Sequence, residues 1–313
     1  MARYTLRQLA QFVAVADAGA ISAAAVKLHL SQGAVNAAVT ELEKIFKVQL
    51  LVRRKAHGIA LTPAGKHLYG RARLLLADAE ELELSASSGG LELAGPLVIG
   101  CYLTLAPTVL PPLLEGFMRE HPRVGLASVE GTQTGLLERL FDGELDLAVV
   151  YETDLPAGLA DVELYRTSAY ALLPAGHRLA ELPEVSLRDL APEPMVLLDA
   201  PPSSHHSISL FERAGMEPNV RYRTTDFEVT RSLVGRGLGY SVLVQHPAVD
   251  ASYEGLAVVS KPLIPAVKPL SVRIVWPQAV RLTDRAQAMV DFAASYSWRS
   301  ARRTVAGSPP QPA

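Results

Sequence analysis

The chain has 313 residues, of which 49% are hydrophobic and 20% are charged. This composition is typical of a globular protein with a sizeable core, and it excludes a fibrous or fully disordered chain. The length allows two domains. The single cysteine, Cys101, excludes an internal disulfide framework and a cysteine-based zinc site.

The net charge of −2 hides a strong asymmetry along the chain. Residues 1–75 carry 11 Lys/Arg and 3 Asp/Glu, a net charge of +8, whereas the remainder carries 19 basic and 29 acidic residues, a net charge of −10. A basic N-terminal unit on an acidic body predicts a polyanion partner for the first and a different role for the second. The alternative is a solvated basic face, but the helical layout below favours nucleic acid.

The longest uncharged stretch, residues 94–114, has roughly the length of a membrane span, but four prolines interrupt it. The N-terminus lacks the charged segment followed by an apolar segment that a secretory signal requires. We therefore expect a soluble, cytoplasmic protein without membrane contact.

The N-terminal segment predicts three short helices. Apolar residues at helical spacing place the first over residues 6–16. The second is expected over residues 23–28 with Ser22 as its cap, and the third runs from its cap Ser31 to Phe46. Two short helices separated by a tight turn, in basic surroundings, indicate a helix-turn-helix.

A long connecting helix is expected to begin at Thr62 and Pro63, with threonine as the cap and proline in the first position. Five apolar residues then repeat at alternating four- and three-residue spacing, which predicts a coiled-coil seam between two chains. They are Leu68, Ala72, Leu75, Ala79 and Leu82. The alternative is that this face packs on its own chain. Residues 63–90 form this linker helix and a Ser/Gly-rich hinge.

From residue 91 to residue 304, strand and helix patterns alternate, which predicts an α/β body. The tail, residues 305–313, is small and proline-rich and is expected to be disordered. The expected strands are 97–101, 124–130, 145–150, 165–173, 220–224, 240–244 and 271–276, and the expected helices are 107–120, 134–141, 204–214, 227–236 and 281–302.

Several of these motifs resemble those of LysR-type transcriptional regulators. In the N-terminal part they are the runs at residues 6–9, 28–32 and 61–65, in the family's order and with its gaps. In the body they are the runs at residues 143–148 and 231–240. The resemblance covers the DNA-binding and the effector-binding parts of that family.

The resemblance implies an all-α winged helix-turn-helix domain over residues 1–62, followed by the linker helix. The α/β effector domain would then be two-lobed and similar to a type II periplasmic binding protein. Lobe 1 is expected over about residues 94–164 and 265–304, and lobe 2 over about 165–264.

The resemblance also implies that the helix opening at Ser31 lies in the major groove and that the wing contacts phosphates. The residues expected to contact DNA are Ser31, Gln32, Asn36, Thr40, Arg53, Arg54 and Lys55. Asn36 either reads adenine or is only a polar residue of the helix surface. The chain departs from the family's usual residues at Gly33, Ala37 and Ala38, so the operator sequence does not follow from the resemblance.

The effector of such a domain lies between the lobes, where strand ends and helix starts offer hydroxyl and NH groups that suit a carboxylate. The candidates are Cys101, Thr104, Thr132, Gln133, Ser203, Ser204, His205, Thr225 and Phe227. The alternative for Ser204 is a purely capping role. Adjacent histidines at 205 and 206 cannot share one helix face, so no metal site is expected. No cofactor is expected either.

The sequence therefore predicts a DNA-binding regulator controlled by a small anionic effector, and not an enzyme. The implied partners are promoter DNA, often an interrupted A·T-rich palindrome, RNA polymerase, and further copies of the chain in a dimer of dimers. Two alternatives remain open. One is a redox-responsive regulator using Cys101 without a resolving thiol. The other is a solute-binding protein or enzyme with an N-terminal extension, for which no catalytic motif is present.

Overall fold

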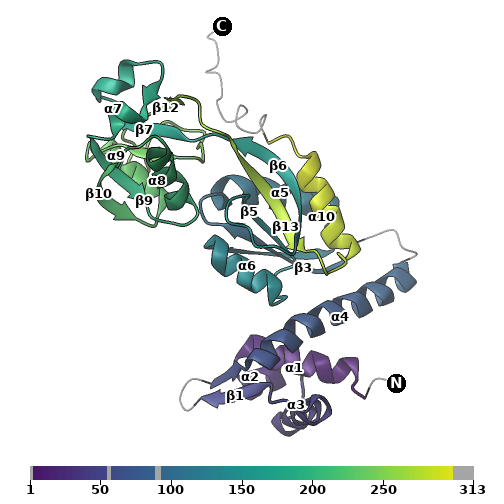
Figure 1. Ribbon diagram of the computed structural model, residues 1–313. Helices are drawn as coiled ribbons and strands as arrows, with labels where there is room; N and C mark the ends of the chain where they lie inside the picture. The colour runs from purple at the N-terminus through teal and green to yellow at the C-terminus, as the bar shows by residue number, and fades with distance from the viewer. Residues whose placement is uncertain (1–2, 55–57, 89–92, 299–313) are drawn as a thin grey trace.

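The computed structural model describes residues 3–54, 58–88 and 93–298. The long helix α4 (Pro63–Ser88) joins a small N-terminal unit to a two-lobed body (Figure 1). The N-terminal unit contains α1 (Leu6–Ala18), α2 (Ile21–Lys27), α3 (Gln32–Phe46) and the hairpin of β1 (Leu51–Arg54) and β2 (Gly58–Leu61).

The N-terminal helices begin where side chains can satisfy their free NH groups. Thr5 and Gln8 form a reciprocal capping box at α1, and the Ser31 hydroxyl accepts from the Ala34 NH at 3.2 Å at the start of α3, as predicted. The prediction that Ser22 caps the second helix is wrong. Helix α2 begins earlier, after Ala20, without a side-chain cap, because its stability comes from burying Ala24 and Ala25.

Glu43 of α3 ties the wing to the helical core. Its carboxylate accepts hydrogen bonds from the NH groups of Leu50 and Leu51, at 2.7 and 3.2 Å. On the other strand, the Ile59 NH donates to the Gly19 carbonyl at 2.8 Å. These bonds fix the position of the wing relative to α3.

Helix α4 begins as predicted, with Thr62 accepting from the Gly65 NH at 2.9 Å. Its first half packs on the N-terminal unit, where Tyr69 donates to Asp17 and burial raises the pKa of the Tyr69 phenol. Ala72 is only 2% exposed and Leu68 packs beside it in the same core. The expected pairing seam must therefore be corrected: Leu68 and Ala72 are used within the chain, whereas Leu75 and Leu82 remain 39% and 71% exposed.

No single described helix is long and apolar enough to cross a membrane. Helices α1 and α2 reach the required length and composition only together, and they are bent by 120° relative to each other.

Lobe 1 is built on a five-stranded sheet in the order β4-β3-β5-β13-β6. Strands β3, β4 and β5 are parallel, and β13 is antiparallel to β5 and β6. Helices α5 and α10 pack together through Phe117 and Phe292, and α6 packs on β3 and β5. The bounds are β3 (Gly95–Tyr102), α5 (Ala106–Glu120), β4 (Val124–Gly131), α6 (Gln133–Phe141), β5 (Leu147–Tyr151), β6 (Leu159–Thr167), β13 (Leu270–Pro277) and α10 (Asp284–Ser295).

The last helix is shorter than predicted. It ends at Ser295, and Trp298 folds back so that its indole NH donates to the Ala293 carbonyl at 2.9 Å. The rest of the predicted helix, residues 299–302, lies outside the described residues, as does the tail at 305–313.

Lobe 2 contains a four-stranded sheet in the order β11-β7-β12-β8 and a parallel pair of β9 and β10. Strands β9 and β12 were not predicted from the sequence. The bounds are β7 (Tyr170–Pro174), η1 (Arg178–Glu181), β8 (Val185–Ser186), α7 (Leu187–Leu190), β9 (Pro194–Leu198), α8 (Ser203–Arg213), β10 (Asn219–Thr224), α9 (Phe227–Gly235), β11 (Ser241–Leu243) and β12 (Val258–Ile264).

The chain passes between the lobes at residues 168–169 and 265–269, a few residues later than expected. The predicted single strand over 165–173 is wrong. Thr167 pairs with β13 in lobe 1, whereas Tyr170 pairs with β11 and β12 in lobe 2, so the segment divides into two strands.

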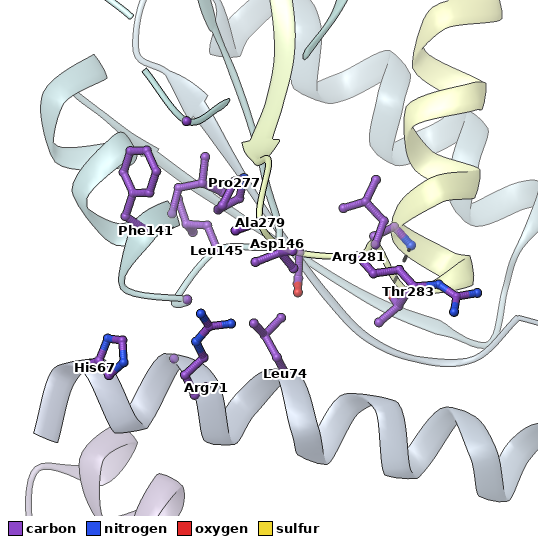
Figure 2. A pocket seen from close by; sticks show the side chains of 17 residues that line it. His67, Arg71, Leu74, Phe141, Leu145, Asp146, Pro277, Ala279, Arg281 and Thr283 are labelled. Carbon is purple, nitrogen blue, oxygen red and sulfur yellow. Dashed lines mark hydrogen bonds between the residues drawn. The ribbon is translucent and has the colours of Figure 1, made fainter. Parts of the chain in front are cut away.

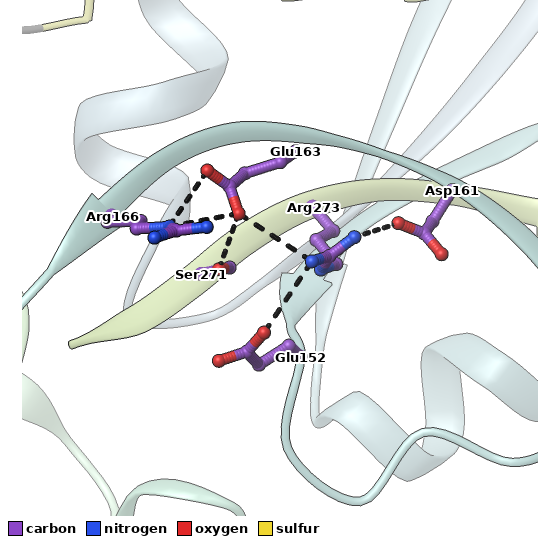
Figure 3. A network of polar contacts seen from close by, with 6 residues as sticks. All are labelled: Glu152, Asp161, Glu163, Arg166, Ser271 and Arg273. Carbon is purple, nitrogen blue, oxygen red and sulfur yellow. Dashed lines mark hydrogen bonds and ion pairs between the residues drawn. The ribbon is translucent and has the colours of Figure 1, made fainter. Parts of the chain in front are cut away.

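An ion-pair network joins β6, β13 and the end of β5 next to these crossings (Figure 3). Arg273 of β13 pairs with Asp161 and lies 3.6 Å from carboxylate oxygens of both Glu152 and Glu163. The Ser271 hydroxyl donates to Glu163 at 2.8 Å and is the main reason that the pKa of Glu163 is lowered. Each pair contributes little in solvent, but the network holds the strands that lead into lobe 2.

Replacing Glu43 by alanine should destabilise the N-terminal unit by about 1.5–3 kcal/mol, because two backbone NH groups lose a charged acceptor. Urea unfolding of the full chain measures this loss. The matched control is Glu41→Ala, which removes an exposed carboxylate that lies 3.5 Å from the exposed Lys44 ammonium. An equal effect of both substitutions would contradict the role of Glu43 in holding the wing.

Candidate DNA interface and effector cleft

The start of α3 presents a short polar surface. Gln32 is exposed in the first helical position, next to the cap Ser31. Asn36 is half-buried one turn later, and the Thr40 hydroxyl donates to its carbonyl at 2.9 Å. Because the hydroxyls of Ser31 and Thr40 are both used by the helix backbone, Gln32 is the side chain with the most reach from this helix end.

The wing and its surroundings carry positive charge. Arg53 and Arg54 are the last two residues of β1, opposite Ile59 and Gly58 of β2. The third wing candidate, Lys55, lies outside the described residues. Arg7 and Lys27 are exposed on the helices of the same unit. An exposed amide at a helix start, in a unit whose other helices carry the exposed side chains of Arg7 and Lys27, is suited to a groove and its phosphates.

In the body, a tyrosine from lobe 1 reaches across to lobe 2. The Tyr102 hydroxyl donates to the Ala200 carbonyl at 2.8 Å and shares a hydrogen bond of 3.1 Å with the Ser203 hydroxyl. A second contact joins Thr108 of α5 to Gln245 beyond β11. Sequence reasoning named Ser203 but not Tyr102, which directly follows the predicted strand at 97–101, because its partners Ala200 and Ser203 are about a hundred residues away in the chain.

Incompletely hydrogen-bonded hydroxyls surround the Tyr102 contact. Thr104, Tyr151 and Ser204 are at most 4% exposed. The Ser204 hydroxyl has no hydrogen-bond partner, and the Thr104 hydroxyl has only a weak interaction with the phenols of Tyr102 and Tyr151, whose pKa values it lowers against the effect of burial. The rings of Tyr151 and Tyr102 meet edge to face, with centroids 5.6 Å apart. A buried hydroxyl without a partner costs roughly 1–3 kcal/mol. These groups are therefore candidates for contact with a polar ligand between the lobes.

Several other residues predicted to contact the effector instead stabilise the fold of one lobe. Thr132 caps α6 through the Gly135 NH. Gln133 is buried, and its amide bonds to the Thr153 carbonyl and the Tyr151 NH, so both ends of the side chain are used inside lobe 1. Thr225 is exposed, and Phe227 packs with the apolar cluster of lobe 2.

His205 lies at a separate groove of about 450 Å³ between the lobes. Its Nδ1 is 3.5 Å from an Asp154 carboxylate oxygen in lobe 1. His206, also at this groove, is buried with no partner for Nε2, and burial lowers its pKa. Arg213 and Lys268 add positive charge to the lining, and neither was foreseen from the sequence. Glu152 and Asp154 line the same groove, so its charge is mixed rather than basic.

Cys101 does not have the environment of a reactive thiol. Its side chain is fully buried in β3, and burial raises its pKa, with the Glu130 charge acting in the same direction. A raised pKa keeps the group protonated at neutral pH, whereas thiolate is the form that reacts with peroxide. The residue is thus part of the apolar core of lobe 1. Its environment does not support the redox interpretation.

Among the described residues, no group of three or more His, Cys, Asp or Glu side chains is placed to hold a metal ion.

Comparisons with known proteins assign both parts of the chain to one family. Residues 6–66 match the family model of the bacterial regulatory helix-turn-helix protein, lysR family, and residues 91–297 match the LysR substrate binding domain. The chain belongs to the LysR family of transcriptional regulators, which are not enzymes. It is therefore a DNA-binding transcriptional regulator with an effector-binding domain, as the sequence predicted.

Individual relatives support the same conclusion. HinK, a LysR family transcriptional regulator from Pseudomonas aeruginosa, is 38% identical with a TM-score of 0.62, over 93% of this chain and 98% of that one. The C-terminal domain of a probable LysR family regulator from Rhodococcus sp. RHA1 is 44% identical with a TM-score of 0.64, over 65% of this chain and all of that one. A probable hydrogen peroxide-inducible genes activator of Mycobacterium leprae is 30% identical over 78% of this chain and 79% of its own length.

The burial of Cys101 predicts that its thiol reacts slowly with reagents in solution. In the native chain at pH 8, Ellman's reagent should react about 100-fold more slowly than in urea, since the thiol must be exposed first. Absorbance at a fixed reagent concentration measures the rate, and the urea-unfolded chain is the control. A native rate equal to the unfolded rate would restore the redox interpretation.

Proposed function

We propose that this regulator binds promoter DNA in the cytoplasm as a dimer of dimers and that a small anionic effector between its lobes controls transcription. The observation that supports it best is the contact across the lobes at Tyr102, next to buried hydroxyls that are not fully hydrogen-bonded. An effector that satisfies those hydroxyls would favour the closed arrangement of the lobes.

The proposed DNA contacts are of two kinds, with base edges and with backbone phosphates. Gln32 reads base edges from the start of α3, while Arg53, Arg54 and Lys55 neutralise phosphates beside the groove. Ser31 and Thr40 act mainly through the helix backbone, because their hydroxyls are already bonded there. The phosphate contacts supply affinity without sequence preference, and the helix end supplies the preference.

For the effector, the proposed contacts are Thr104, Ser203 and Ser204 near Tyr102, with His205 at the groove that also contains Arg213 and Lys268. Hydroxyl donors and nearby basic side chains suit a small carboxylate. An effector can change promoter activity only to the extent that it binds one arrangement of the assembly better than another.

Assembly is proposed through the exposed part of α4, where Leu75, Ala79 and Leu82 continue at heptad-like spacing beyond the N-terminal core. Pairing there would place two DNA-reading units at a fixed spacing. Contacts between effector domains would complete the dimer of dimers, and RNA polymerase is the proposed further partner at the promoter.

Replacing Arg53 and Arg54 together by alanine should weaken binding to any duplex and flatten its salt dependence. The slope of log K against log salt should lose about 0.9 for each phosphate contact removed. Fluorescence anisotropy with one operator fragment and one unrelated duplex, at several salt concentrations, measures both effects.

The matched control removes the same charge from the effector domain, with alanine at exposed Arg119 and Arg178. That variant should keep the parental slope. If the wing variant keeps it too, the wing does not contact phosphates and the proposed interface is wrong.

A further inference from the structure

A cavity of about 320 Å³ lies between α4 and lobe 1, away from the Tyr102 contact (Figure 2). We call it the linker pocket. One wall consists of α4 residues, among them Arg71 and Leu74. The other comes from the end of α6, the turn that leads into β5 and the loop after β13. The two walls thus belong to different units of the protein, the linker helix and the effector domain.

The walls are held together by an unusually close backbone approach. A Cβ atom on Gly70 of α4 would lie 2.0 Å from the Asp142 carbonyl oxygen, and one on Gly143 would lie 2.5 Å from the Gly70 Cα. Beside them, Arg73 donates to the carbonyls of Gly143 and Glu144, at 3.2 and 2.6 Å. The linker pocket therefore exists only while α4 is docked on the turn between α6 and β5.

The lining has the composition of a small-molecule site. Leu74, Leu145 and Pro277 give it apolar walls, and Phe141 at its edge is 48% exposed. Figure 2 shows Arg71 extending from α4 toward Leu145 and Asp146. Apolar walls with a few converging polar groups are typical of ligand pockets, and this volume accommodates an aromatic ring with a short substituent.

The guanidinium of Arg71 has hydrogen-bond donors that no protein group accepts in the described part of the chain. Among the described residues it forms no ion pair and no side-chain hydrogen bond, whereas Arg73, two residues later, donates to two backbone carbonyls. The nearby carboxylate of Asp146 is already bonded to the Val98 NH at 2.7 Å, and Arg73 and Arg285 offset its charge. An anionic ligand would therefore find a planar, bidentate partner in Arg71 without displacing an existing ion pair.

We infer that the linker pocket is a second ligand site, which takes a small organic monoanion with an aromatic or branched apolar body. The anionic group pairs with Arg71, and the apolar body lies against Leu74, Leu145 and Pro277. Because such a ligand touches both units, it binds the docked arrangement better and favours it. The site is independent of the proposed effector contacts between the lobes.

The test uses the full chain and salicylate, a fluorescent monoanion with a single aromatic ring that matches the size of the pocket. Fluorescence titration gives its Kd for four variants. Arg71→Gln should weaken binding about tenfold, the loss of one charge-assisted contact. Ala279→Trp, which fills the pocket from an exposed position, should weaken it at least as much.

Two controls locate the binding. Arg119→Gln removes an exposed arginine elsewhere, and Thr104→Val changes the space between the lobes; both should keep the parental Kd. The inference is overturned if Arg71→Gln has no effect, or if Thr104→Val is the variant that weakens binding. It is also overturned if the apparent Kd rises with protein concentration, since a second copy would then occupy the pocket. Circular dichroism melts confirm that each variant is folded.

Discussion

The contact between Gly70 and Gly143 is the constraint on which the arrangement of this regulator depends. Two glycines allow a helix backbone and a turn to meet at a distance that any Cβ would prevent. Arg73 then reaches the carbonyls of the turn, which leads directly into β5 of lobe 1. A displacement of β5 in lobe 1 would therefore reach α4 through this turn. Helix α4 in turn packs on the DNA-reading unit through Tyr69 and Ala72.

The space between the lobes and the linker pocket each offer polar side chains to a ligand. Between the lobes, Tyr102 bonds across to lobe 2 while neighbouring hydroxyls are not fully hydrogen-bonded. At the linker, Arg71 retains unused donors beside an apolar hollow. The hydroxyls between the lobes are desolvated, so a ligand that bonds to them recovers lost hydrogen bonds, whereas Arg71 is exposed and offers a hydrated charge beside an apolar wall. Cys101, by contrast, sits in a satisfied apolar core and offers no such gain.

Much of the fold was predictable because local signals were strong. Capping residues placed α3 and α4, and apolar periodicity placed most strands of lobe 1. The signals failed where tertiary contacts decide. Residues 165–173 look like one strand, yet they pair with two different sheets. The site was only partly predictable: Ser203 and Ser204 follow from a helix start, but Tyr102, Arg71 and Gly70 matter through partners far away in the chain.

The most direct test of the account is the distance between the DNA-reading unit and lobe 1 within one chain. Spin labels at Val26→Cys and Met118→Cys, both exposed positions, report it by pulsed dipolar spectroscopy when labelled chains are diluted with unlabelled ones. Docking predicts one narrow distance distribution. Gly70→Ala should broaden it, since the substitution favours the helix by about 1 kcal/mol but forbids the backbone approach. Identical distributions for both chains, or a broad one in the parent, would contradict the account.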